Sequence, residues 1–163
     1  MNSSVSTKRY SACDMELSFA EIFGAIRSRR ERARMIADKI RLAKGYPWAG
    51  VYDVAEKEIR LISCAGRSEP AIPSFPKDKG LNGRAVMNRQ TVVVNDIDKD
   101  EDYLLTFRNT KSEIVVPVFS SDGKEVVGTI DVEGEKVNAF NEDDIRFLED
   151  CARKISGLWN KEP

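Results

Sequence analysis

Hydrophobic residues at three- and four-residue spacing predict one long helix near the N-terminus. The pattern runs from Glu16 to Lys44 and stops at Gly45 and Pro47, which are typical of a helix C-terminus. Residues 1–14 are serine-rich and lack the pattern, so we expect a disordered tail there. The apolar positions of the helix are Phe19, Ile22, Phe23, Ile26, Ala33, Ile36, Ala37 and Ile40.

The pattern then changes to short β-type segments. Trp48–Val54 and Glu58–Cys64 predict a hairpin, and the proline-containing stretch Gly66–Lys79 that follows is expected to be a loop. Further along, the sequence predicts a helix at Gly80–Asn88, a strand at Thr91–Val94, an acidic loop at Asn95–Asp102 and a helical turn at Tyr103–Asn109.

The last third of the chain predicts two strands and a helix. The strands are Lys111–Val118 and Val127–Glu133, and Asn141 is the expected N-cap of the helix, with acidic residues in its first turn. Because the strands come in hairpins, we expect an α+β fold: an antiparallel sheet with the terminal helices on one face. The apolar face of the last helix holds Ile145, Leu148, Ala152, Ile155 and Trp159.

The turn Ser120–Lys124 decides which residues share a face of the sheet, because a slip of one residue exchanges the faces. A two-residue turn at Asp122-Gly123 would mix apolar and acidic residues. A three-residue loop with Gly123 left-handed places Glu113 opposite Asp131 and separates the apolar residues from the acidic ones. One face then holds Ile114, Val116, Val118, Val126, Ile130 and Val132, and the other holds Glu113, Val115, Pro117, Val127, Thr129, Asp131 and Glu133.

This register gathers Glu113, Asp131 and Glu133 at one end of one face. Clustered carboxylates repel one another, so a cation is expected beside them. A ligand amine could supply it, or a salt-bridge network from Arg67, Arg84 or Lys111 could do so, and the pattern leaves both readings open. We expect no metal, because a calcium loop would need several oxygen ligands at short spacing.

Composition excludes several classes of function. With 26 basic and 27 acidic residues, nothing demands a nucleic acid or membrane partner, and the arginine-rich stretch Arg27–Arg34 is interpreted as a solvated face. No apolar segment is long enough to span a bilayer, and the N-terminus lacks a secretory pattern, so a cytoplasmic location is expected. The absence of histidine rules out Ser-His-Asp and Cys-His catalysis.

Three cysteines, Cys13, Cys64 and Cys151, are widely spaced and form no CxxC motif, which argues against a disulfide framework or a zinc site. We interpret Cys64 and Cys151 as small core residues and expect no cofactor.

Several motifs in order resemble the GAF domain family, from about Tyr46 to Leu158. That resemblance implies a profilin-like antiparallel sheet of about six strands, terminal helices on one face and a ligand pocket on the other, in one domain spanning 15–163. The motifs are Trp48-Ala49-Gly50-Val51-Tyr52, Gly80-Leu81-Asn82-Gly83-Arg84-Ala85-Val86, Val94-Asn95-Asp96, Ser112-Glu113-Ile114-Val115-Val116-Pro117, Gly128-Thr129-Ile130-Asp131-Val132-Glu133 and Phe140-Asn141-Glu142-Asp143-Asp144.

Within that family the chain is most similar to the free methionine-(R)-sulfoxide reductases. The resemblance places their pocket on Trp48, Glu113, Asp131 and Glu133 and their cysteines on positions that here hold Ile72, Asn82 and Thr106. A sulfoxide reductase needs an attacking and a resolving thiol, so the resemblance implies a pocket without the catalytic groups.

The first hypothesis is therefore a non-catalytic module, such as a sensor in signal transduction, that binds a small polar or amine-bearing molecule. Its expected ligand-binding residues are Trp48, Tyr52, Asn82, Thr106, Glu113, Asp131 and Glu133, with Arg67 and Phe75 at the rim. A reductase-like enzyme is the second hypothesis. The third is a homodimer through the terminal helices, using Ile26, Ala33, Ile36, Ile40, Leu158 and Trp159.

Overall fold

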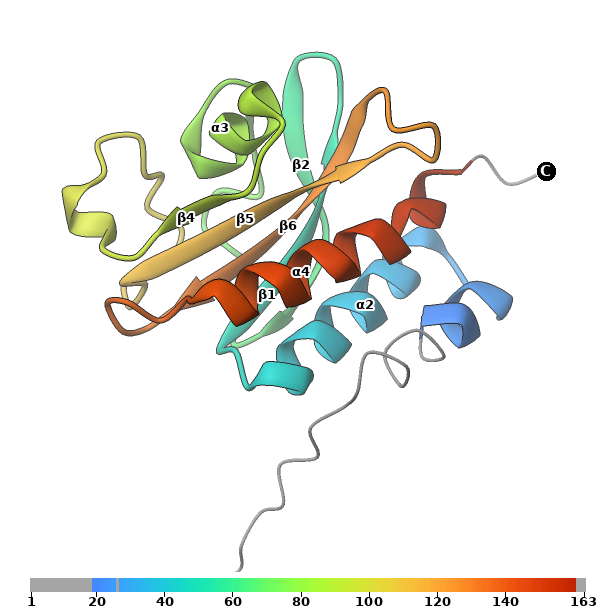
Figure 1. The fold of residues 1–163 in the computed structure, drawn as a ribbon, viewed down its shortest axis with the longest axis horizontal. Coiled ribbons are helices and arrows are strands. Elements are labelled where there is room, and N and C mark those ends of the chain that lie inside the picture. The colour runs from blue at the N-terminus through green and yellow to red at the C-terminus, as the bar shows by residue number, and fades with distance from the viewer. Residues whose placement is uncertain (1–18, 26, 161–163) are drawn as a thin grey trace, which may run out of the picture.

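The computed structural model describes residues 19–25 and 27–160, which form one antiparallel sheet with helices on both sides (Figure 1). The predicted tail at 1–14 and Ile26 of the predicted dimer stripe lie outside the described residues. The strand order is β3-β2-β1-β6-β5-β4, and every neighbouring pair is antiparallel. The strands are β1 (Trp48–Val54), β2 (Glu58–Gly66), β3 (Ser74–Pro76), β4 (Val92–Val94), β5 (Ser112–Phe119) and β6 (Val126–Gly134).

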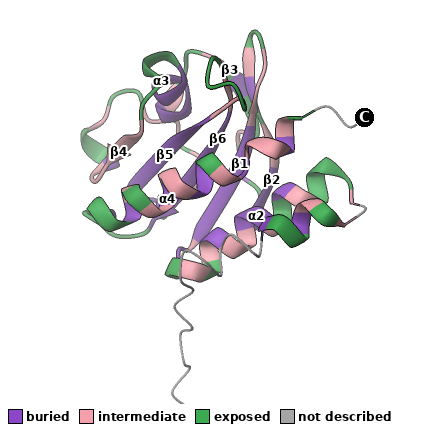
Figure 2. Cartoon of the chain, turned by 45° about the vertical axis from the view of Figure 1, so that its right-hand side comes forward, coloured by how far each residue is buried: buried purple, intermediate pink, exposed green. Residues whose placement is uncertain are grey.

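Two long helices lie side by side on one face of the sheet (Figure 1): α2 (Arg29–Lys44) and α4 (Glu142–Lys154). The shorter α3 (Gly80–Asn88) packs on the opposite face, where its Leu81 and Ala85 contact Val115 of β5. Two 3₁₀ helices complete the described elements, η1 (Ile97–Lys99) and η2 (Ser156–Trp159). The central strands are buried, whereas the outer sides of the helices are exposed (Figure 2). The predicted α+β class and its layer of terminal helices are confirmed.

The predicted N-terminal helix is interrupted. Residues 19–24 are helical, but the chain leaves the helix before Ser28, and α2 begins at Arg29. Ser28 starts the new helix with a capping box: its side chain accepts from the Glu31 amide while Glu31 accepts from the Ser28 amide. The periodicity of the apolar residues continues across the break, which is why the sequence predicted a single helix. The C-terminus was predicted correctly, with Gly45 left-handed at φ 73°.

Most of the predicted dimer stripe is buried inside the chain. Ala33, Ile36 and Ile40 have no exposed surface, and Leu158 has little. They pack between the helices and the sheet, so a dimer through the terminal helices would have to use other residues.

Two loop predictions were wrong. The stretch Gly66–Lys79 contains β3, which adds to the edge of β2 through pairs such as Ile59 with Phe75. Tyr103–Asn109 forms no helical turn but crosses the face of the sheet as irregular chain. The C-terminal helix also ends earlier than predicted, because α4 stops at Lys154 and Trp159 belongs to η2.

The register of β5 and β6 differs from the prediction by two residues. Glu113 lies opposite Glu133, and Asp131 lies opposite Val115. Gly123 is left-handed as expected, at φ 72°, but the loop is longer because Ser120 pairs with Glu125. A bulge at Val118/Phe119 then shifts the register once more.

Because two shifts of one residue return each side chain to its predicted face, the acids remain together on the face opposite the long helices. Val126 and Val127, beyond the bulge, are exchanged relative to the prediction. Val126 contacts the cluster around Trp48 and Tyr52, and Val127 contacts the cluster beneath the helices.

The N-cap of α4 gives the first testable prediction. Asn141 Oδ1 accepts from the amides of Asp143 (2.9 Å) and Asp144 (3.2 Å), and Asp144 accepts in return from the Asn141 amide. Asn141→Ala should therefore lower the free energy of unfolding by about 1 kcal/mol, measured by urea denaturation. Glu142→Ala is the control: its side chain is exposed in the same turn, and it should lose no more than about 0.5 kcal/mol. Equal losses in both variants would contradict the cap.

Candidate functional site

The three predicted acids meet at the centre of the sheet. Glu113 comes from β5, while Asp131 and Glu133 come from the adjacent β6, one of the two central strands. Their side chains alternate onto the same face because residues two apart in a strand point the same way. All three are buried, with 5%, 2% and 3% of their surface exposed. A carboxylate oxygen from each lies within 4.8 Å of one from each of the others.

Asp131 is held from α3. Asn82 donates from Nδ2 to Asp131 Oδ2 at 2.7 Å, and Thr129 donates to the Asn82 carbonyl oxygen, which fixes the orientation of that amide. The other oxygen, Asp131 Oδ1, is buried and receives no hydrogen bond from the surrounding protein. This oxygen can therefore accept a hydrogen bond from a further donor.

Glu133 is held from the irregular segment that precedes β5. The hydroxyl groups of Thr106 and Thr110 donate to its two oxygens, Oε1 and Oε2. Tyr103 lies next to Thr106, with 3.4 Å between their hydroxyl oxygens. Burial and the nearby Glu133 raise the pKa of Tyr103 to about 12.

Burial raises the pKa of each acid, and repulsion from neighbouring carboxylates adds to the rise at Glu113 and Asp131. Desolvation is the largest cause for all three, and charge repulsion from Asp131 and then Glu133 adds to it at Glu113. The neighbouring Asp131 carboxyl group favours the protonated form of Glu113 and so raises its pKa, whereas Glu113 lowers the pKa of Asp131. At Glu133 the two threonine hydroxyls and, more weakly, Arg67 oppose the rise in pKa.

The basic side chains that were expected to neutralise this cluster form their ion pairs with other acids. Arg84 binds Asp100 and Asp102, Lys111 binds Asp98, and Arg67 binds Glu135. The sequence left two hypotheses open, a ligand amine and a salt-bridge network. These three residues do not form that network.

Aromatic residues form the walls around the acids. Trp48 packs against Phe107 with ring centroids 5.3 Å apart and donates from Nε1 to the Ser68 carbonyl oxygen at 3.0 Å. Tyr52 packs against Phe75 at 5.9 Å, and burial, followed by the charge of Asp131, raises the pKa of its hydroxyl group.

Two small cavities flank the acid cluster and together include all seven predicted ligand-binding residues. The first is lined by Tyr52, Phe75, Gly80, Leu81, Asn82, Leu104, Thr106, Glu113 and Asp131, and the second by Pro47, Trp48, Arg67, Phe107, Thr110, Glu133 and Glu135.

Sequence reasoning missed Leu104, Phe107, Thr110 and Thr129. Thr129 was placed on the acidic face, where it is found, so strand alternation could have identified it. Leu104, Phe107 and Thr110 lie in irregular chain, where no periodicity indicates direction.

Glu113, Asp131 and Glu133 are the group in the described part of the chain whose oxygens could hold a metal ion. Ca²⁺ binds six to eight oxygens and Mg²⁺ retains water in an octahedron. The cluster offers three carboxyl groups and two threonine hydroxyls, divided between two small cavities.

Burial disfavours the thiolate form of both described cysteines. Burial raises the pKa of Cys64, with Glu69 adding to the rise, and burial raises that of Cys151 to about 12. Neither lines the cavities. Cys13 lies outside the described residues.

A larger open groove lies on the opposite face, between α4 and the strands β4 and β5. Its lining includes Arg89, Val93, Phe119, Ile145 and Arg153. It contains none of the three buried acids, so the small cavities are the better candidate site despite their size. No helix in the described part of the chain has the length and apolarity needed to cross a membrane.

Comparison with known proteins agrees with this architecture. Residues 20–158 match the family model described as "GAF domain". The chain is 35% identical over 116 residues to the free methionine-R-sulfoxide reductase of Saccharomyces cerevisiae, a match that covers 71% of this chain and 64% of that relative. The chain thus spans less than two thirds of that relative.

Solved structures show the same fold. The free methionine-R-sulfoxide reductase of Neisseria meningitidis, in complex with its substrate, superposes with a TM-score of 0.79 at 25% identity, covering 97% of this chain and 93% of that one. A structure described as that of the GAF domain gives a TM-score of 0.80 at 25% identity, covering 96% and 98%. The chain therefore belongs to the GAF domain family and is similar to free methionine-R-sulfoxide reductases.

Proposed function

We propose that this protein is a non-catalytic binding module whose cavity takes a small molecule bearing a protonated amine. The observation that carries the proposal is the set of three buried carboxyl groups, while Arg67, Arg84 and Lys111 form their ion pairs with other acids. An ammonium group has three donors and one positive charge. It would donate to the open oxygen of Asp131 and lower the pKa values that burial has raised.

Each of the two cavities has room for about one water molecule, so a ligand of amino-acid size would need the residues that cover the acids to move. The aromatic pairs Trp48–Phe107 and Tyr52–Phe75 stand on two sides of the acids and can contact an apolar chain. Methionine sulfoxide, which the yeast relative is named for, carries an amine and belongs among the compounds to test. Any sensing role, with its output through a partner or a homodimer, would follow from occupation of this cavity.

A thermal-shift screen tests the proposal. The compounds are free amino acids, methionine-(R)-sulfoxide, alkylamines and the chlorides of Ca²⁺, Mg²⁺ and Mn²⁺. A bound amine at about 100 times its Kd should stabilise the fold by about 2.7 kcal/mol, and Tm should rise accordingly. Asp131→Asn should abolish the shift, whereas the exposed turn variant Asp122→Asn should retain it. Stabilisation by a metal alone, or by none of the compounds, would contradict an amine ligand.

The enzymatic alternative rests on the similarity to sulfoxide reductases and has a separate assay. Reductase chemistry needs a thiolate, and the burial of Cys64 and Cys151 disfavours one at both positions. We expect no turnover of free methionine-(R)-sulfoxide with dithiothreitol as reductant. Turnover that is lost in the triple Cys→Ser variant would replace the binding module with a thiol enzyme.

A further inference from the structure

We propose that residues 100–110 are a lid over the acidic cavity and that the ion pair between Arg84 and Asp100 is the latch that holds the lid closed. The inference deepens the proposed function, on which it rests for the ligand. The opening of the lid itself can be measured without any ligand.

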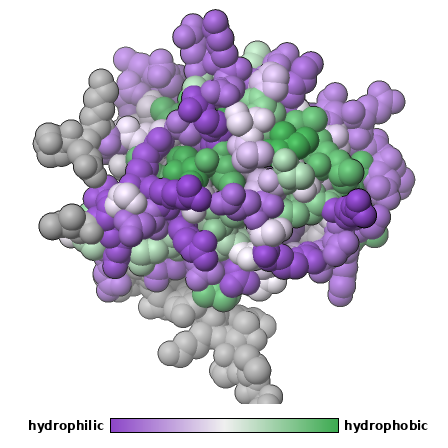
Figure 3. Space-filling view, turned by 180° about the vertical axis from the view of Figure 1, so that it is seen from behind, coloured by the Kyte–Doolittle hydropathy of each residue, from purple (hydrophilic) through white to green (hydrophobic). Residues whose placement is uncertain are grey.

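The lid covers both cavities. Leu104 and Thr106 line the cavity at Asp131, and Phe107 and Thr110 line the one at Trp48. Because at most 5% of the surface of Glu113, Asp131 or Glu133 is exposed, a ligand cannot reach these acids until covering residues move. Seen from behind, this side of the molecule shows hydrophobic groups between hydrophilic side chains (Figure 3). Leu105, in the lid, is itself 62% exposed.

Side chains rather than a backbone ladder hold the lid. Residues 103–107 belong to no helix or strand, and Thr106 contributes a long backbone contact of 3.4 Å to the Ala71 amide. Segments with few backbone hydrogen bonds open at low free energy unless other contacts retain them. The side-chain contacts of the lid therefore decide how often it opens.

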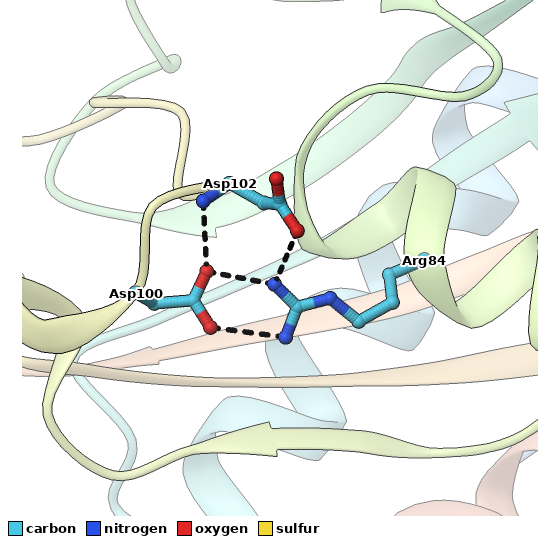
Figure 4. Close-up of polar contacts among 3 residues, drawn as sticks. All are labelled: Arg84, Asp100 and Asp102. Carbon is cyan, nitrogen blue, oxygen red and sulfur yellow. Dashed lines mark hydrogen bonds and ion pairs between the residues drawn. The ribbon is translucent and has the colours of Figure 1, made fainter.

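Arg84 makes the most extensive of these contacts (Figure 4). Its Nη1 donates to Asp100 Oδ2 at 2.9 Å and its Nη2 to Asp100 Oδ1 at 2.7 Å, and Nη2 also reaches Asp102 Oδ2 at 2.9 Å. The Asp102 amide donates to Asp100 Oδ1 at 3.0 Å. A two-pronged guanidinium–carboxylate pair is among the strongest polar contacts in proteins. The Asp100 side chain is 15% exposed, and the hydrogen bond from Arg84 lowers its pKa.

The other end of the latch is fixed. Arg84 belongs to α3, whose Leu81 and Ala85 are buried against Val115 of β5. The same helix provides Asn82, which holds Asp131 in the cavity. One short helix thus binds the base of the cavity through Asn82 and its cover through Arg84.

The remaining lid contacts are of a kind that a ligand can replace. Thr106 and Thr110 donate to Glu133, and an ammonium group would compete for the same oxygens. Phe107 packs on Trp48, where the ligand chain would lie. The pair of Arg84 with Asp100 lies outside both cavity linings, so it is the contact that keeps the lid closed with or without a ligand.

Hydrogen exchange followed by mass spectrometry tests the latch in the full chain without ligand. Arg84→Gln and Asp100→Asn should each speed the exchange of amides 103–110 about tenfold, as expected from the loss of a charge-assisted pair. Strand β5 should keep its protection in both variants. Asp102→Asn is the matched control, since the Asp102 side chain is 71% exposed and makes a single contact with Arg84, and its lid should exchange as in the wild type. Arg84→Lys, which keeps the charge but loses the two-pronged geometry, should fall between.

Unchanged exchange in Arg84→Gln would overturn the latch. Equal acceleration in the lid and in β5 would overturn it too, because that result means general loss of stability. If the screen above finds an amine ligand, Arg84→Gln should raise its association and dissociation rates together. If the screen finds none, the proposed function fails while the exchange result still decides the latch.

Discussion

The Glu113→Gln variant is expected to unfold at a higher temperature than the wild type at about pH 8 when no ligand is present. Glu113 is buried beside Asp131 and Glu133, and burial followed by their charges raises its pKa well above its ordinary value. Its ionised form therefore destabilises the folded state. Glutamine keeps the shape, removes the charge and can donate to the open oxygen of Asp131. We expect a gain of about 1 kcal/mol or more in the free energy of unfolding.

The raised pKa values also predict how the stability of the fold depends on pH. A carboxyl group whose folded pKa is raised stabilises the fold fully below its unfolded pKa, and that contribution is lost as the pH rises through the folded pKa. In the wild type, the contributions of Glu113, Asp131 and Glu133 should therefore fall as the pH rises above their ordinary pKa values, 4.5 for the two glutamates and 3.8 for Asp131. The pKa of Asp100 is lowered by Arg84, so its contribution is lost instead as the pH falls. Unfolding curves at about pH 5 to 8 should show a smaller decline for Glu113→Gln than for the wild type.

The control for this measurement is Asp122→Asn. Hydrogen bonds from Ser120 and the Lys124 amide lower the pKa of Asp122, which lies in an exposed turn. Its loss should leave the stability at about pH 8 unchanged or slightly lower. A Glu113→Gln variant that is less stable than the wild type at that pH would show that the ionised carboxylate is favourably paired and that the charge of the cluster is compensated within the protein.

The same substitution should have opposite effects on stability and on binding. Removing a charge from the cluster relieves repulsion in the empty protein but also removes an acceptor for the proposed ammonium group. Uncompensated charge at a buried site is common where a protein binds a ligand, because stabilising that site on its own weakens its function. A salt-bridge cluster without a ligand would show no such opposition.

The residues that form the acidic face could be predicted because strand alternation is insensitive to an error of two residues. The expected pairing of Glu113 with Asp131 was wrong, yet the acids still share a face, since a four-residue loop and a bulge together shift the register by two. Only Val126 and Val127, between the loop and the bulge, were assigned to the wrong faces. A bulge has no hydrophobic pattern of its own, so the sequence could not locate it.

The lid could not be predicted for a different reason. Its position is set by contacts between residues far apart in the sequence, such as Arg84 with Asp100 and Phe107 with Trp48. Irregular chain also has no repeating pattern that predicts which way its side chains point. Thr106 was placed in the site because of the family resemblance, whereas Thr110 was missed. The break before Ser28 was missed as well, although its capping box is visible in the sequence as Ser28 and Glu31.

The Gly66→Ala variant should be the most destabilised of the single substitutions considered, with an expected loss of about 2–4 kcal/mol. Gly66 ends β2 opposite Trp48 at φ 131°, a conformation that residues with side chains rarely adopt. A methyl group there would lie 2.7 Å from the Pro47 carbonyl oxygen and 2.9 Å from Trp48 Cδ1. The backbone of Pro47 cannot move without disturbing β1, so the indole should shift from its contacts with Ser68 and Phe107.

Gly45→Ala separates the clash from the effect of positive φ alone. Gly45 is also left-handed, at φ 73°, but an added methyl group would meet no atom within 4 Å. The Gly45→Ala variant should therefore lose only about 1 kcal/mol in the free energy of unfolding. Urea denaturation compares the free energies of unfolding. Tryptophan fluorescence in a Trp159→Phe background, which leaves Trp48 as the sole tryptophan, reports the position of the indole. If Gly66→Ala loses no more stability than Gly45→Ala and leaves the Trp48 emission unchanged, the close approach of β2 to Trp48 does not position that wall of the cavity.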